Sequence, residues 1–150
     1  MRQQAESLGC VLSASIQPHV PNGYKINKPR DVGTVKLMNF CNRLHLNDAE
    51  IIRFPLSDDP RFVIELLEKS EDVAPLSAVI FDHLMKNPYL IPDRWKKGVT
   101  HFLGTIFSDS PGTLYVPYTY WDGEKWHGGY CPLGWGPGRP IFIALHLYLE

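Results

Sequence analysis

The sequence has no long hydrophobic run, little net charge and few cysteines, and each shortage excludes a class of protein. No apolar stretch approaches the roughly 20 residues that a membrane-spanning helix needs, and the stretch 8–16 is broken by Gly9, Ser13 and Ser15. The formal net charge is -1, from 15 basic and 16 acidic side chains. A chain so close to neutral lacks the basic excess that draws proteins to duplex nucleic acid or to an anionic membrane. We therefore expect neither of these as a partner.

The cysteines and histidines favour neither a disulfide framework nor a metal site. Cys10, Cys41 and Cys131 are widely spaced and odd in number, which is typical of reduced thiols. The six histidines never form a His-x-His or His-x-x-x-His pair, the tight spacing that zinc sites use. The N-terminus is a poor signal peptide. We expect a cytoplasmic protein with no metal and no cofactor.

The length of 150 residues and the 44% hydrophobic content predict a single globular domain, residues 1–150. Two halves differ in pattern. Residues 1–87 are predicted to be mainly helical, with helices over 32–46, 59–70 and 75–86 after a short strand at 8–16 and a loop at 17–30. Residues 88–150 are predicted to be an aromatic-rich antiparallel half. The predicted fold is therefore α+β, with two to three N-terminal helices packed on a three- to four-stranded meander.

The strongest local signal is Asp122-Gly123, which lies between aromatic and β-branched runs and predicts a tight two-residue hairpin. In that register Trp121 pairs with Glu124, and Thr119 pairs with Trp126. Because strand side chains alternate between faces, the aromatic residues sort into two sets. The face with Leu114, Val116, Tyr118, Tyr120, His127 and Cys131 is predicted to be the core side. The other face is predicted to be partly exposed.

Part of the chain, from about residue 83 to residue 143, resembles a short β module of uncharacterised bacterial proteins. The pattern that carries the resemblance is Ile91-Pro92-x-x-Trp95-Lys96, then Gly104-Thr105-Ile106-Phe107, Leu114-Tyr115-Val116, Tyr120-Trp121-Asp122-Gly123 and Trp126. The resemblance implies a bacterial origin and a compact β module. It implies no activity, and no residue role is taken from it.

The partly exposed aromatic face is the first candidate for function, because Tyr and Trp supply flat apolar area with a polar tip. We expect a non-enzymatic binding or interaction module, in which Trp126→Ala abolishes binding with little loss of stability. The predicted binding residues are Tyr115, Trp121, Trp126, Tyr130 and Trp135. The simpler interpretation is that these rings only complete the core.

Three alternatives stay open. The first is a small hydrolase-like enzyme that uses Cys131 or His127, in which Cys131 is the nucleophile and His101 or His127 is its base. The second is an obligate homo-oligomer with the aromatic face as its subunit interface. The third, a minor one, is a single-strand nucleic-acid binder, because basic side chains near stacking rings are typical of such proteins. The basic residues in question are Arg94, Lys96, Lys97 and Lys125. The protein or small-molecule partner is not identified by the sequence.

Overall fold

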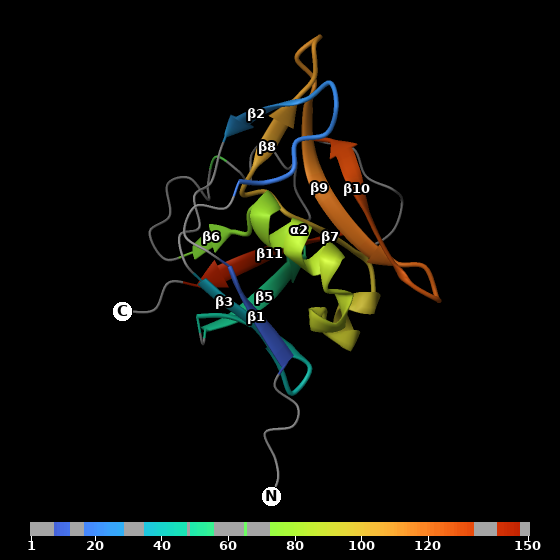
Figure 1. The fold of residues 1–150 in the computed structure, drawn as a ribbon. Coiled ribbons are helices and arrows are strands. Elements are labelled where there is room, and N and C mark those ends of the chain that lie inside the picture. Colours follow the sequence, from blue (N-terminus) through green and yellow to red (C-terminus); the bar gives the residue numbers. More distant parts are fainter. Residues whose placement is uncertain are drawn as a thin grey trace, which may run out of the picture.

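The computed structural model describes residues 8–12, 17–28, 35–47, 49–55, 65, 73–133 and 141–147. Figure 1 shows one mixed sheet that wraps around a single longer helix. The strands are β1 (Leu8–Leu12), β2 (Lys25–Lys28), β3 (Val35–Phe40), β4 (Arg43–Leu46), β5 (Ala49–Pro55), β6 (Val73–Pro75), β7 (Val99–His101), β8 (Ile106–Ser108), β9 (Leu114–Trp121), β10 (Trp126–Pro132) and β11 (Ile141–Leu147). The helices are α2 (Ala78–Lys86) and the 3₁₀ turns η2 (Pro88–Leu90) and η3 (Asp93–Lys96).

The strands follow one another in the order β1-β3-β4-β5-β11-β7-β9-β8-β2, with β10 paired to β9 and β6 paired to β11. Among the described strand pairs, β7 and β11 run parallel and the others run antiparallel. The late strand β11 lies between β5 and β7, so it joins the N-terminal strands to the aromatic half of the sheet.

The predicted fold class is wrong, because the described part of residues 1–87 contains six strands and one helix of seven or more residues. The helix predicted over 32–46 is replaced, from residue 35 onward, by the hairpin of β3 and β4. Leu37, Leu44 and their neighbours have helical spacing by coincidence, whereas β3 alternates strictly between buried and less buried side chains. Period two therefore decides the structure of this segment.

A turn at Cys41 and Asn42 makes that hairpin possible. Both residues have positive φ, 53° and 64°, which is the geometry of a type I′ turn. Asn47, with φ 53°, makes the next corner, and its side-chain oxygen accepts the Lys36 N–H at 2.9 Å. Because a cysteine is an unusual residue for a left-handed position, the sequence gives little warning of the first corner.

The helix predicted over 75–86 is present as α2, although it begins three residues later than expected. Pro75 belongs to β6, and the hydroxyl of Thr105 accepts the Ala78 N–H at 2.9 Å. A side chain from a distant loop thus takes the capping role that Ser77 leaves unfilled. The helix ends at Lys86, with Asn87 as its C-cap just before Pro88, as the sequence predicts. The helix predicted over 59–70 lies outside the described residues, with the exception of Glu65.

Other expectations are met in part. The strand predicted over 8–16 is present as β1, and its residues 13–16 lie outside the described part of the chain. The segment 17–30, predicted to be loop, contains the short edge strand β2. Residues 141–147, which lie in the half predicted to be antiparallel sheet, form β11.

The β9–β10 hairpin exists, but its register is two residues away from the predicted one. Trp121 pairs with Trp126 and Thr119 with Gly128. The corner is longer because Asp122 Oδ1 accepts the N–H groups of Glu124 and Lys125, at 2.7 and 2.9 Å. A shift of two residues leaves each side chain on its predicted face.

Both faces of this hairpin are packed. The main core cluster joins α2, η2 and η3 to β1, β3, β4 and β5, and Trp126 and Tyr130 are partly buried against it. A second core cluster lies on the other face and contains Leu103, Ile106, Val116, Cys131, Leu133, Ile143 and Leu145. The face predicted to be partly exposed is therefore the one that faces the main core.

Candidate functional site

The helix α2 lies against the middle of the predicted aromatic face (Figure 1). Thr119 Oγ1 is 3.4 Å from Met85 Sδ, and a Cβ added at Gly128 would stand 2.9 Å from both Met85 Sδ and the Phe81 ring. Glycine at this position therefore lets β10 approach the helix closely. The predicted binding residues within the described part of the chain separate into two groups.

Tyr115 and Tyr130 form the first group, together with rings that the sequence analysis did not select. The ring centroid of Tyr24 lies 4.7 Å from that of Tyr115 and 6.2 Å from that of Tyr130. Phe107 and Phe81 contact Tyr130 edge to face, at 5.3 and 5.7 Å. Tyr24 follows the Asn22-Gly23 turn, in which Gly23 has φ 88°. This turn is the sequence feature that could have indicated that the chain folds back and brings Tyr24 to the group.

Trp121 and Trp126 form the second group at the hairpin corner. Their rings meet edge to face at 5.5 Å, and Lys96 Nζ lies 4.1 Å from the centroid of the Trp121 ring. The basic and aromatic residues are thus adjacent here, as the nucleic-acid alternative requires. However, Lys96 also pairs with Asp93 at 3.2 Å, which offsets its charge. Trp135 lies outside the described residues.

A groove opens between α2, β10 and residues 17–19, and it holds one of the predicted binding residues. Its volume is about 720 Å³, within the range of roughly 300–1,000 Å³ that small-molecule sites occupy. Val79, Phe81, Met85 and Tyr130 supply apolar walls, and Gly128 lies beside them. The polar lining residues are Gln17, His19, Asp82, His83 and Lys86.

The carboxylate of Asp82 is the main electrostatic feature of this groove. Its Oδ2 accepts the backbone N–H of His19 at 2.7 Å, and burial raises the pKa of Asp82 above its usual value. Burial also lowers the pKa of His83, whose Nδ1 lies 3.8 Å from Cys10 Sγ. The sequence predicts none of these residues as part of a site, because nothing in their spacing brings residue 19 next to residue 82.

Of the two imidazoles considered as a base for Cys131, the structure places His101 beside the thiol and His127 away from it. Cys131 is 3% exposed, and burial raises the pKa of its thiol to about 11. The imidazole beside it belongs to His101, with Nε2 3.9 Å from Sγ. His127 lies four residues away along β10, at the hairpin corner, where its Nε2 contacts Asp122. Backbone N–H groups of Lys125 and Glu124, and then His127, lower the pKa of Asp122 to about 2.

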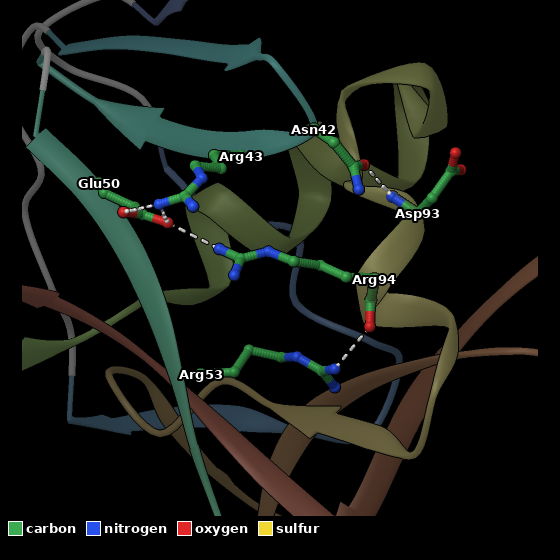
Figure 2. Close-up of polar contacts among 6 residues, drawn as sticks. All are labelled: Asn42, Arg43, Glu50, Arg53, Asp93 and Arg94. Atoms are coloured by element: carbon green, nitrogen blue, oxygen red, sulfur yellow. Dashed lines mark hydrogen bonds and ion pairs between the residues drawn. The ribbon is translucent and has the colours of Figure 1, made fainter.

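A second polar cluster joins η3 to β5 (Figure 2). Arg53 donates to the carbonyl oxygens of Arg94 and Lys97 at 2.9 and 2.8 Å. The guanidinium carbon of Arg53 lies 4.1 Å from the centroid of the Phe142 ring. Burial, and then the charge of Arg94, lower the pKa of Arg53 to about 10. Glu50 accepts from both Arg43 and Arg94. Since Arg53 satisfies the carbonyls that the short helix leaves unpaired, we interpret the cluster as structural.

Two further findings limit the site. No group of three or more His, Cys, Asp or Glu side chains in the described part of the chain is arranged to hold a metal ion. None of the described helices is long and apolar enough to cross a membrane.

Comparison of the chain with protein-family models, with curated proteins and with solved structures finds no match. The groove must therefore be interpreted from its own residues.

Proposed function

We propose that this protein is a non-enzymatic binding module and that its ligand lies in the groove between α2 and β10. The observation that carries the proposal is the combination, in one open groove of about 720 Å³, of apolar walls and convergent polar groups. This combination is typical of small-molecule sites, in which apolar surface supplies affinity and a few polar groups fix orientation. Tyr130 keeps the role predicted for it.

Two observations favour binding over catalysis. The thiol of Cys131 is buried, and burial raises its pKa, so it is a poor nucleophile at neutral pH. His127 is held by Asp122 at the hairpin corner and is separated from Cys131 by four residues of strand, about 13 Å. Together these contacts make Cys131 and His127 a poor catalytic pair.

We propose a cytoplasmic location and a bacterial origin on narrower grounds. The cysteines Cys10, Cys41 and Cys131 are all free in the structure, which is usual in a reducing compartment. The bacterial origin rests on the resemblance of the segment 83–143.

Light scattering after size-exclusion chromatography tests the oligomer alternative, in which the predicted aromatic residues meet a second copy.

The binding proposal is tested by titrating small aromatic fragments into isotope-labelled protein and following the backbone amide signals. We expect the signals of residues 79–86 and 128–130 to move together. The variant Gly128→Leu adds a side chain that points at Phe81 and Met85, so it should block binding, whereas Tyr115→Phe should not. Fragments that shift only the signals of Trp121 and Trp126 would place the site at the hairpin corner instead.

A further inference from the structure

The negative charge of the Asp82 carboxylate is not neutralised by an ion pair inside the described part of the groove. Within the described residues, Asp82 accepts one hydrogen bond, from the backbone N–H of His19 at 2.7 Å. No ion pair of Asp82 occurs among the residues that the structure describes. Its carboxylate is half-buried, so the groove holds a negative charge that is partly removed from water and has no cationic partner in contact.

The bases around Asp82 compensate its charge only in part, because His19, Lys86 and His83 lower the pKa of Asp82 by less than burial raises it. Burial lowers the pKa of His83, so its imidazole is uncharged at neutral pH. Lys86 is exposed in the last turn of α2, where an ammonium interacts favourably with the helix C-terminus and with water. His19 contributes its backbone N–H and a favourable electrostatic interaction with the carboxylate.

Tyr130 places a second polar atom close to this carboxylate. Burial, and then the charge of Asp82, raise the pKa of Tyr130 to about 12, so its hydroxyl stays protonated. No hydrogen bond of that hydroxyl occurs within the described ranges. Its ring meets Phe81 edge to face at 5.7 Å and continues the apolar wall toward Met85.

We infer that the groove binds an arylalkylamine, meaning a protonated amine on an aromatic body, with the ammonium on Asp82 and the ring against Phe81, Met85 and Tyr130. An ammonium supplies the N–H donors that the carboxylate and the Tyr130 hydroxyl lack. Aromatic walls also attract a cation that lies near them. A carboxylate ligand would be repelled by Asp82. This inference rests on the proposed function and specifies its ligand class.

Three probes of similar shape separate the contribution of charge from that of the apolar body: 2-phenylethylamine, 2-phenylethanol and 3-phenylpropanoate. Each is titrated at neutral pH into the isotope-labelled protein, with the amide signals of α2 and β10 as the readout. We expect the amine to bind about tenfold or more tightly than the alcohol, and the carboxylate to bind most weakly.

The variant Asp82→Asn keeps the shape of the side chain and removes its charge. It should weaken the amine about tenfold or more and leave the alcohol unchanged. Glu124→Gln, at the exposed hairpin corner, is the matched control and should alter neither. Tyr130→Phe, which removes only a hydroxyl, should weaken the amine severalfold and keeps the test available if Asp82→Asn does not fold.

The outcomes separate this inference from the proposed function. If the alcohol or the carboxylate binds in the groove as tightly as the amine, the inference falls and the binding groove stands. The same holds if neither Asp82→Asn nor Tyr130→Phe affects the amine. If no probe moves the signals of α2 and β10 even at millimolar concentration, the inference falls. If the wider fragment titration is also silent there, the proposed function falls with it.

Discussion

The imidazole of His101 and the thiol of Cys131 face each other across β9, with Nε2 3.9 Å from Sγ. His101 is 2% exposed, and its Nδ1 has no hydrogen-bond partner among the residues that the structure describes. Burial lowers the pKa of His101 to about 4 and raises that of Cys131 to about 11. Both groups are therefore neutral at neutral pH, and the pair is a packing contact rather than an ion pair.

This burial predicts sensitivity to acid. The unfolded chain takes up a proton at His101 near its ordinary pKa of 6.5, whereas the folded chain does so only near 4. Stability is thus complete above about pH 6.5 and is lost as the pH falls toward 4, by on the order of 3 kcal/mol. Urea unfolding at several pH values should reveal this slope, and His101→Phe should flatten it. An unchanged slope in the variant would assign the acid sensitivity to other groups.

The second prediction concerns thiol reactivity. Cys41 is exposed, whereas Cys131 is buried and its thiol has a raised pKa. Iodoacetamide at neutral pH should modify Cys41 within minutes and should modify Cys131 only after denaturant is added. Mass spectrometry of the digested protein locates the label. Rapid, stoichiometric labelling of Cys131 in the folded protein would revive the enzyme alternative.

The third prediction compares the two tryptophans of the hairpin corner. Trp126 packs on the main core cluster, whereas Trp121 mainly contacts Lys96 and Trp126. Trp126→Ala should therefore lower the free energy of unfolding by about 2 kcal/mol and Trp121→Ala by about 1 kcal/mol. This is more than the small loss expected at Trp126 from the sequence. Denaturant titration measures both, and equal losses would contradict the unequal packing.

The fourth prediction concerns a close backbone approach at Gly104. A Cβ added at Gly104 would stand 2.6 Å from the carbonyl oxygens of Pro75 and Leu76, and the Gly104 N–H donates to Leu76 at 2.8 Å. Because both obstacles are backbone, Gly104→Ala should cost roughly 3 kcal/mol. Gly112→Ala is the comparison. It meets no atom within 4 Å but has φ 99°, so it should cost about 1 kcal/mol.

The sequence predicts local structure well where one residue type determines the backbone. Pro88 ends α2, and Asp122 makes the hairpin corner. It fails where two periods compete: residues 37–44 read as a helical stripe, and the decisive corner is formed by Cys41 and Asn42, neither of which is glycine. The candidate site depends on contacts between residues that are far apart in the sequence. His19 meets Asp82, and Tyr24 meets Tyr115, and no spacing along the chain contains that information.

The position of β11 also governs how the protein is made. Its residues, 141–147, pair with β5 on one side and with β7 on the other. Both β5 and β7 therefore keep an unpaired edge until residues 141–147 have been synthesised. Such open edges attract other chains, and pairings between distant segments form slowly. We therefore expect the nascent chain to be most prone to aggregation before the residues of β11 have been synthesised.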